Sequence, residues 1–236
     1  MEKAVALDFY GSEALRLAAR PGYGTLVLGS EFCERLLPDA REFAAFRDLF
    51  PGRLALATPL LTDDGLDRVR ELLRLGTAGG RRLEVVANDL GLLEVLRAGF
   101  RRGVEVSCGR VLANRVRIMP REYARGFLAR YKVARIEADD AGALARLKAL
   151  GPEISWHHPF RYATLTRFCP WEKRWAFACA RSCRGKATPL SSPRVPETLW
   201  LRGPAYFVKG QGPRRDAARC VFTPSPKTSA PVRTRR

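Results

Sequence analysis

The spacing of short apolar segments is the feature of this sequence that most restricts its fold. Over the first 150 residues, short β-rich runs alternate with amphipathic helical stretches about every 25 to 30 residues, as successive βα units require. Each run is mostly apolar, as expected of parallel strands that are buried on both faces. The predicted strands are Val5–Leu7, Thr25–Leu28, Leu54–Ala57, Leu83–Ala87, Val104–Cys108, Ala134–Glu137 and Ile154–Trp156. This pattern predicts an α/β fold: a (β/α) barrel related to the TIM barrel, complete or incomplete, or a doubly wound sheet if its ends do not meet.

Helices are predicted between these strands from their capping residues and glycines. Asp63 and Asp64 suit the N-terminus of a helix, where the helix dipole favours acidic side chains. Two further helices present apolar faces within residues 92–96 and 144–150. Glycine favours helix ends, and the three helices are predicted to stop at Gly76, Gly99 and Gly151.

The chain after Trp156 departs from this alternation. Residues 1–222 are interpreted as one domain, in which residues 157–186 form a loop rich in cysteine, aromatic residues and arginine. Pro189–Pro196 is interpreted as a linker, and residues 223–236 as a disordered basic tail. Thr198–Leu201, Tyr206–Val208 and Cys220–Phe222 are predicted to be closing strands or a hairpin.

Charge is distributed very unevenly along the chain. The formal net charge is +18, yet residues 1–100 hold 13 basic and 15 acidic side chains and the remaining residues hold 29 and 9, so the second half carries +20. Such asymmetry indicates an anionic partner: nucleic acid, an acidic protein, a membrane surface or a phosphorylated ligand. Genomic base composition is the competing explanation, because 35 of the 42 basic residues are arginine.

The N-terminal sequence argues against export. Glu2 is acidic and the first apolar run ends at Asp8, which is too short for a signal-peptide core, so a cytoplasmic location is expected. No transmembrane segment is expected, because no stretch approaches the roughly 18 consecutive apolar residues of a membrane span. Six cysteines in a reducing compartment then require a reason other than disulfides.

Three cysteines gather in one segment. Cys169, Cys179 and Cys183 follow a C-x9-C-x3-C spacing. Cys33 follows the second predicted strand, where a loop at the active face of a barrel would present it as a fourth ligand. Four thiolates suit zinc or an iron–sulfur cluster. The wide spacing and the nearby arginine and aromatic side chains favour a cluster over zinc: Arg167, Arg181, Arg184, Phe168, Trp171 and Trp175.

Buried free cysteines are the alternative interpretation, because cysteine often serves as a small core residue. Cys108 lies inside a predicted strand and Cys220 inside a late one, and for both the core interpretation is favoured. The sequence therefore divides the six cysteines into four candidate ligands and two core residues.

Several motifs resemble those of the peptidase U32 family, in particular its short members that act in oxygen-independent ubiquinone biosynthesis. The likeness spans residues 25–222, and the order of the four cysteines is its most specific part. Its motifs are Leu28–Cys33, Glu84–Gly91, Gly109–Arg115, and His158–Tyr162 leading to Arg167–Cys169. The resemblance implies a β/α-barrel-like fold and a [4Fe-4S] cluster on Cys33, Cys169, Cys179 and Cys183.

The function expected from this resemblance is that of an iron–sulfur protein supporting hydroxylation without O2, as a heterodimer with a second U32-family protein and with a redox donor. Arg110, Asn114 and Asn88, at predicted strand ends, would line the substrate pocket, and His158 is a candidate general base.

Three other functions remain open from the sequence. RNA base hydroxylation would use the basic second half and its aromatic side chains to hold phosphates and stack on bases. A peptidase is suggested by the family name, although the signature of the longer members is missing. A zinc-stabilised binding module would use the same four cysteines without redox chemistry.

Overall fold

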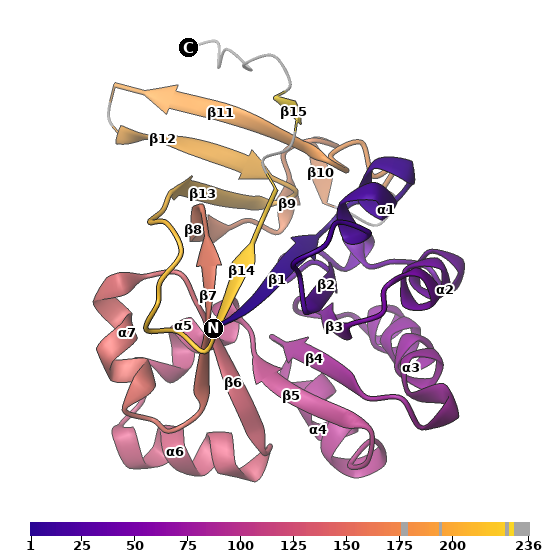
Figure 1. The fold of residues 1–236 in the computed structure, drawn as a ribbon. Coiled ribbons are helices and arrows are strands. Elements are labelled where there is room, and N and C mark those ends of the chain that lie inside the picture. Colours follow the sequence, from indigo (N-terminus) through magenta and orange to yellow (C-terminus); the bar gives the residue numbers. More distant parts are fainter. Residues whose placement is uncertain (176–178, 194, 225–226, 229–236) are drawn as a thin grey trace.

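Eight parallel strands close into a barrel in the computed structural model, which describes residues 1–175, 179–193, 195–224 and 227–228 (Figure 1). Around the barrel the strand order is β1, β14, β7, β6, β5, β4, β3, β2. The strands are β1 (Glu2–Leu7), β2 (Thr25–Gly29), β3 (Arg53–Ala57), β4 (Leu83–Ala87), β5 (Val104–Cys108), β6 (Val133–Ala138), β7 (Glu153–His158) and β14 (Arg219–Phe222). The predicted (β/α) barrel is confirmed, and each of the seven predicted strands lies within an observed one.

Closure of the barrel depends on its last strand. β14 lies between β1 and β7 and pairs with both in parallel, with Glu2 opposite Arg219 and Val5 opposite Phe222. The predicted closing strand Cys220–Phe222 is part of β14. A doubly wound sheet, whose ends would not meet, is therefore wrong.

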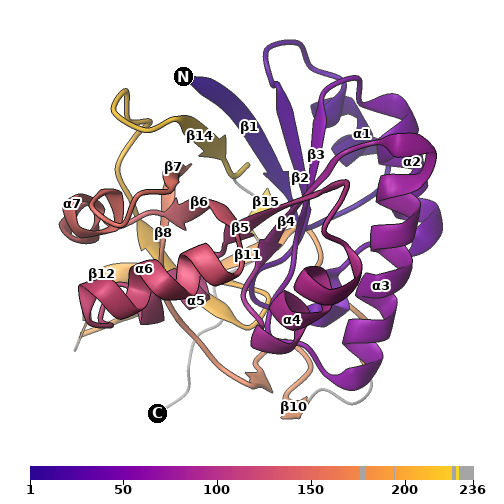
Figure 2. The ribbon, with the colours of Figure 1, turned by 90° about the horizontal axis from the view of Figure 1, so that it is seen from below.

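Helices lie around the outside of the barrel (Figure 2). They are α1 (Ser12–Ala18), α2 (Ala40–Leu49), α3 (Asp63–Thr77), α4 (Leu90–Gly99), α5 (Arg110–Val116), α6 (Arg121–Arg130) and α7 (Ala141–Lys148), with short 3-10 helices η1 (Glu34–Leu36) and η2 (Ala78–Gly80). α3, α4 and α7 were predicted, while α1, α2, α5 and α6 were missed. None of the described helices is long and apolar enough to cross a membrane.

Local capping explains where two of these helices begin. Thr62, and not Asp63, is the N-cap of α3, since its hydroxyl accepts a hydrogen bond from the Gly65 amide. α2 begins with a capping box in which Asp39 and Glu42 each accept a hydrogen bond from the other's backbone amide. Asp63 instead occupies the first turn of α3, where its negative charge still interacts favourably with the positive end of the helix dipole.

A second sheet lies beyond the carboxyl ends of the barrel strands (Figure 1). Its order is β15 (Lys227–Thr228), β11 (Lys186–Ser192), β12 (Val195–Arg202), β13 (Ala205–Lys209) and β8 (Phe160–Leu165). A separate hairpin joins β9 (Phe168–Cys169) to β10 (Arg174–Trp175). The chain between β7 and β14 therefore forms a strand-rich extension in the place where the last βα unit of a regular barrel would stand.

The sequence interpretation of this extension needs two corrections. Residues 157–186 are more than a loop, because they contain β8 and the β9–β10 hairpin. Pro189–Pro196 is wrong as a linker, because β11 pairs with β12 in a hairpin with Pro189 opposite Trp200. Among the described residues, β15 pairs with Lys186 and Ala187 of β11 and not with Pro189.

The predicted basic tail also contains a strand. Lys227 and Thr228 form β15, which pairs in parallel with the first residues of β11. Residues 225–226 and 229–236 of the predicted tail lie outside the described residues.

The barrel interior is divided into an apolar and a charged half. One half is filled by small side chains: Ala4, Val27, Ala55, Ala57, Val86 and Val221. The other half holds buried polar side chains from β4, β5, β6, β7 and β14: Glu84, Ser107, Glu137, Ser155 and Arg219. The strand faces that point outward pack against the helices and form the main hydrophobic core. The interior thus holds a polar network beside an apolar cluster, and the main hydrophobic core surrounds both.

Candidate functional site

Buried polar residues follow the carboxyl ends of five barrel strands. Glu31 follows β2, Asn88 follows β4, Arg110 begins α5 after β5, Asp139 follows β6, and His157 lies near the end of β7. All five are buried. In (β/α) barrels this face is where the loops build active sites. The geometry here therefore defines the candidate site.

The four cysteines predicted as ligands line one cavity of about 450 Å³ at this face. Cys33 lies in the loop between β2 and η1, and Cys169 ends β9. Cys179 and Cys183 lie between β10 and β11. Leu60, Leu61, Leu165 and Trp175 contribute apolar wall to the cavity. Three separate parts of the chain thus bring four thiols to one place.

The thiol groups influence one another in this cavity. Burial raises the pKa of Cys33 to about 11, and the neighbouring Cys179 and Cys169 contribute to the increase. Burial raises the pKa of Cys183 to about 12, with further increases from Cys33, Cys169 and Cys179. A bound metal centre would supply the positive charge that thiolates require, as metal binding to cysteine generally does. A set of four sulfur donors fits zinc or an iron–sulfur cluster.

A single-ion site is not formed by the side chains as they stand. Within the described ranges, no group of three or more His, Cys, Asp or Glu side chains is arranged to hold one metal ion. The four sulfurs of a zinc site must all lie about 2.3 Å from one ion. In a four-iron cluster each thiolate binds a different iron, so the same four sulfurs stand further apart. The shared cavity is compatible with this wider arrangement.

Arginine side chains also lie at the cysteine cavity. Arg167 lines it, as the predicted charge compensation requires, and so does Arg35, which the sequence analysis did not identify. Arg184 is engaged elsewhere: its guanidinium pairs with Glu42 at 2.9 Å and lies over the Tyr10 ring at 4.9 Å. The cationic surroundings are therefore only partly those predicted.

The other two cysteines lie apart from this cavity. Cys108 is fully buried in the core between the barrel and its helices. Cys220 is buried on β14, with its sulfur 3.4 Å from that of Met1. The division of the cysteines into four and two thus matches their positions in the fold.

Asn88 holds three segments of the barrel rim together. Its Nδ2 donates to the Thr58 carbonyl at 2.8 Å, and its Oδ1 accepts a hydrogen bond from the Leu112 amide at 3.1 Å. Nδ2 also lies 3.4 Å from Glu31 Oε2. Asn88 was predicted to line the substrate pocket. Its contacts indicate a positioning role instead.

Gly109 lies so close to Asn88 that a side chain there would meet the Asn88 amide. We expect Gly109→Ala to lower the free energy of unfolding by about 1–3 kcal/mol, because the buried amide must leave its hydrogen-bond partners to make room. Denaturant unfolding measures this loss. Gly126→Ala is the matched control: Gly126 lies in α6 with open space around it, and alanine should stabilise that helix by up to about 1 kcal/mol. Equal effects at both positions would contradict this account of Asn88.

Arg110 links the ends of three strands. Its Nε donates to Glu31 Oε1 at 2.8 Å, its backbone amide donates to Glu31 Oε2 at 2.5 Å, and its Nη1 donates to Asp139 Oδ2 at 3.1 Å. Asp139 also accepts a hydrogen bond from the Tyr162 amide at 2.7 Å. Although burial disfavours the charge, these two carboxylates raise the pKa of Arg110. Arg110 is thus a fixed cation at the candidate site, where the sequence analysis expected it.

A second buried network lies deeper in the barrel. Arg219 donates to both oxygens of Glu84 at 2.6 Å, to Glu137 Oε1 at 3.1 Å and to Ser155 Oγ at 3.0 Å. β4 and β14 stand opposite each other in the barrel order, so the ion pair of Glu84 and Arg219 crosses the lumen. The sequence analysis missed this network. Its only signal was a single charged residue within an otherwise apolar strand, such as Glu84 in β4 and Arg219 in β14.

His157 joins the two networks. Its Nε2 lies 2.6 Å from Glu137 Oε2 and 3.9 Å from Glu31 Oε1. Its Nδ1 is buried and has no hydrogen-bond partner among the described residues. Burial, assisted by the charge of Arg110, holds the pKa of His157 well below its ordinary value. Burial also raises the pKa of Glu137 to about 7.

His158 and Asn114, both predicted as site residues, lie away from this cluster. His158 lines a different cavity with Lys3, Cys220 and Phe222, and its ring lies 5.6 Å from that of Phe222. Asn114 lies within α5, where it accepts a hydrogen bond from Arg117. Of the two histidines, His157 is therefore the one that the fold brings to the candidate site.

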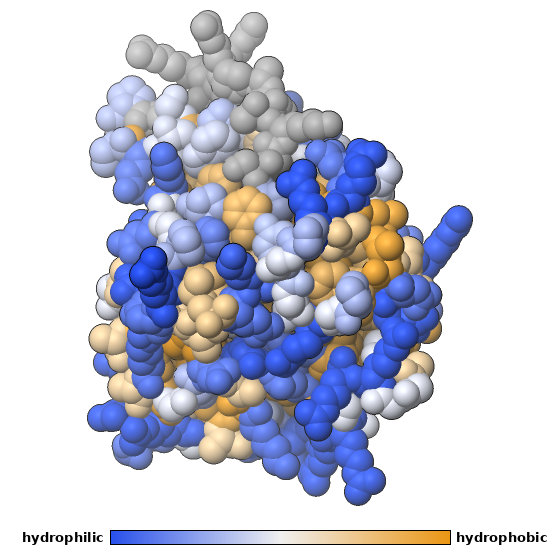
Figure 3. Space-filling model, in the orientation of Figure 1, coloured by the Kyte–Doolittle hydropathy of each residue, from blue (hydrophilic) through white to orange (hydrophobic). Residues whose placement is uncertain are grey.

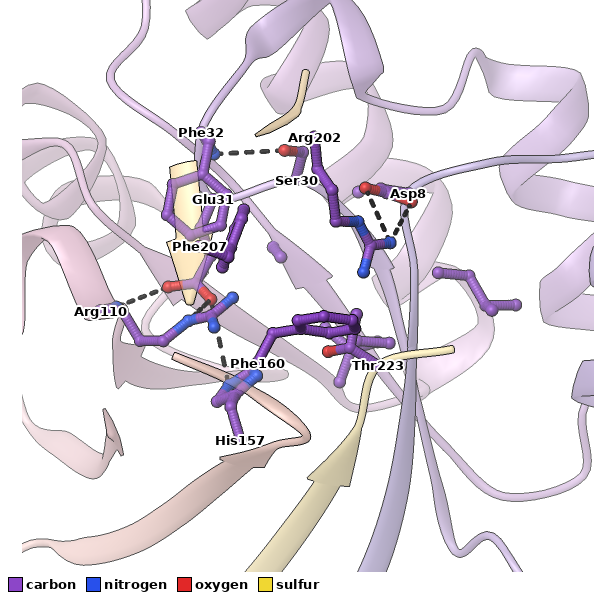
Figure 4. A pocket seen from close by; sticks show the side chains of 15 residues that line it. Asp8, Ser30, Glu31, Phe32, Arg110, His157, Phe160, Arg202, Phe207 and Thr223 are labelled. Atoms are coloured by element: carbon purple, nitrogen blue, oxygen red, sulfur yellow. Dashed lines mark hydrogen bonds and ion pairs between the residues drawn. The ribbon is translucent and has the colours of Figure 1, made fainter. Parts of the chain in front are cut away.

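A small cavity opens at the mouth of the barrel above His157 (Figure 4). We call it the barrel-mouth cavity. Its volume is about 50 Å³, and Arg110, Arg202 and three phenylalanines line it: Phe32, Phe160 and Phe207. Glu31 and Phe32 line both this cavity and the cysteine cavity, so the two are adjacent. Arg202 is held by Asp8 at 3.2 Å, and Arg110 lies over the Phe32 ring at 5.0 Å.

The fold and site define a TIM-barrel-like α/β protein with a four-thiol cavity beside a buried acid–histidine pair. The chain matches no protein-family model, and no curated protein is significantly similar to it. The resemblance to the peptidase U32 family therefore rests on the motifs quoted above.

Proposed function

We propose that this chain is an iron–sulfur protein of the peptidase U32 type that supports oxygen-independent hydroxylation, most simply of a quinone precursor. The observation that carries the proposal is the cysteine arrangement. One cavity is lined by Cys33, Cys169, Cys179 and Cys183, although in the sequence the barrel strands β3 to β7 lie between Cys33 and the other three. Cys108 and Cys220 do not line that cavity, so its four thiols are the number that a [4Fe-4S] cluster requires.

In this proposal the four cysteines hold the cluster and the adjacent barrel-mouth cavity receives the substrate. The cluster would supply electron transfer or activation of an oxygen donor. Phe32 lines both cavities and would form part of the wall between the cluster and the substrate. Arg110, held by Glu31 and Asp139, would orient an oxygen-bearing substituent. A second U32-family subunit, a redox donor and a cytoplasmic location belong to the same proposal.

Anaerobic purification followed by absorption spectroscopy and iron, sulfide and zinc analysis tests the metal centre. We expect about four irons and four sulfides per chain and a broad absorption band near 400 nm. One zinc per chain without colour would favour a zinc-stabilised binding module. Protein that contains no metal even after anaerobic reconstitution with iron and sulfide would contradict both.

RNA binding is a second candidate function, favoured by a basic cavity at the opposite end of the barrel. This cavity of about 640 Å³ lies at the amino ends of β5 and β6, where hydrophilic side chains cover the lower part of the molecule (Figure 3). Glu94 pairs with Arg97 and Arg130. The basic side chains that line it are Arg82, Arg97, Arg101, Arg102, Arg130 and Lys132.

Salt dependence tests this candidate. If the basic cavity holds phosphates, affinity for single-stranded RNA should fall by one or more powers of ten between about 50 and 200 mM salt. Arg101→Glu/Arg102→Glu should then weaken binding more than Arg16→Glu/Arg20→Glu, which makes the same charge change on and just after α1. Equal losses in the two variants would indicate nonspecific attraction to the net charge.

A further inference from the structure

We propose that His157 and Glu137 form a proton relay, which exchanges one proton between the Glu137 carboxyl group and an oxygen-bearing group in the barrel-mouth cavity. The oxygen belongs to a hydroxyl or carbonyl substituent of the substrate, or to water. The identity of that substrate rests on the proposed function, whereas the relay itself rests on the geometry of the buried pair.

The side chains of His157 and Glu137 are in direct contact. Nε2 of His157 and Oε2 of Glu137 lie 2.6 Å apart, and both residues are at least 95 % buried. The other carboxylate oxygen, Oε1, accepts a hydrogen bond from Arg219 at 3.1 Å. Glu137 is therefore oriented so that its available oxygen faces the imidazole ring.

The other ring nitrogen of His157 lacks a hydrogen-bond partner in the part of the chain that the structure describes. Nδ1 of His157 has no hydrogen-bond partner among the described residues, although buried polar atoms normally have one. His157 lines the barrel-mouth cavity, whose volume of about 50 Å³ exceeds the roughly 10–15 Å³ that one water molecule needs. In the proposed relay, an oxygen-bearing group in this cavity is the partner of Nδ1.

The surroundings of the pair determine which of the two side chains carries a proton. Burial strongly disfavours an imidazolium ion at His157, as do the charges of Arg110 and Arg219, while Glu31 opposes them. Burial and Glu84 make the Glu137 carboxylate easier to protonate, whereas Arg219 and Arg110 oppose this. His158, the neighbouring residue on β7, also disfavours a charged ring. A proton that enters the pair is therefore held on Glu137, and the ring stays neutral.

These conditions define a balanced transfer. An O–H group in the cavity gives its proton to Nδ1, while Nε2 gives its own proton to Glu137 Oε2. The ring changes tautomer without becoming charged, Glu137 becomes neutral, and the negative charge passes to the oxygen in the cavity. Arg110 lines the same cavity and would stabilise that charge. The reverse sequence delivers a proton to the oxygen.

Nitrogen-15 NMR of the full chain tests the relay, because the protein contains only two histidines. Above pH 7 the proton of His157 should lie on Nε2, where it can donate to ionised Glu137. As the pH falls through about 7, Glu137 takes up a proton and donates to Nε2, so the ring proton should move to Nδ1. The two ring nitrogens are then expected to exchange their protonated and unprotonated chemical shifts.

Two variants sharpen the measurement. Glu137→Gln should remove the switch and leave one tautomer at every pH, whereas His158→Gln, which changes the other cavity, should leave it intact and assign the signals. A ring that becomes doubly protonated between pH 5 and 8, or that keeps one tautomer throughout in the unchanged protein, would overturn the relay. If Glu137→Gln fails to fold, the titration of the unchanged protein still decides.

The relay and the proposed function can fail separately. Metal analysis of the same preparation reports on the cysteine cavity, and the tautomer switch reports on the barrel interior. A switch without any metal centre would retain the relay and refute the iron–sulfur proposal. A cluster without a tautomer switch would support the iron–sulfur proposal and refute the relay.

Discussion

Arg219→Met is expected to lower the free energy of unfolding at pH 7 by about 3–5 kcal/mol, a large part of the roughly 5–15 kcal/mol that stabilises a typical domain. Arg219 is fully buried and donates to Glu84, Glu137 and Ser155. Methionine fills a similar volume but removes the cation that pairs with both oxygens of Glu84 at 2.6 Å, leaving the longer contacts to Arg53 and Arg135 at 3.9 and 3.8 Å. Urea unfolding followed by circular dichroism measures the loss.

Two further variants separate this cause from simple mispacking. Arg215→Met changes an exposed arginine in the loop that precedes β14 and should alter stability by no more than about 0.5 kcal/mol. Adding Glu84→Met to Arg219→Met removes the carboxylate that has lost its closest cation and should recover at least half of the loss, as replacement of whole buried ion pairs by apolar side chains can. A double variant as unstable as Arg219→Met alone would show that packing, and not charge, is the cause.

The effect of Arg219→Met should also depend on pH. Burial alone would raise the pKa of Glu84, but the hydrogen bonds and charge of Arg219 hold it below its ordinary value. This depressed pKa stabilises the fold above the pKa of the unfolded chain, near 4.5, and the stabilisation is lost as the pH falls. Loss of Arg219 removes the hydrogen bonds and charge that contribute most to depressing the pKa of Glu84, so this pH-dependent stabilisation is smaller in the variant. The difference between the two proteins should therefore shrink from pH 7 towards pH 4.5.

Cys33→Ala is expected to abolish the metal centre while leaving the barrel folded. Cys33 is half-buried and lies in the loop after β2, so its loss removes one of four ligands without opening the main core. Iron and sulfide per chain after anaerobic reconstitution measure the effect, and thermal unfolding of the metal-free proteins checks the fold.

Cys108→Ala and Cys220→Ala are the matched controls, because both cysteines are buried away from the cysteine cavity. They should retain the full iron and sulfide content and lose only the modest stability of a smaller core side chain. A full cluster in Cys33→Ala, or its loss in Cys108→Ala, would refute the ligand assignment.

The barrel could be predicted because the outward-facing residues of its strands follow a regular apolar pattern. Leu83, Val85 and Ala87 on β4, for example, pack against the helices and give the strand its apolar character. The inward-facing Glu84 could not be interpreted in the same way, because its partner Arg219 is 135 residues away. A pairing across the lumen depends on closure of the whole barrel and leaves no local pattern.

Site residues that follow the end of a strand were predicted. A site residue within a strand was missed, because the alternation of side chains along the strand decides which face it occupies. Cys33 and Arg110 were placed correctly from their position after β2 and β5. The last of the seven predicted parallel strands was predicted to stop at Trp156, whereas β7 continues to His158. Because side chains alternate between the two faces of a strand, this extension turns His157 inward and His158 outward. A difference of two residues in one strand boundary thus changed which histidine belonged to the site.

The position of β14 sets an order of events during synthesis of the chain. Because ribosomes release the N-terminal part first, β1 and β7 must wait with unpaired edges until residues 219–222 have emerged. By then all four cysteines of the cavity have already left the ribosome, since Cys183 precedes β14 by more than 30 residues. The thiols therefore leave the ribosome before the barrel closes, and if the proposed cluster is bound, this interval would give its carrier the widest access to them.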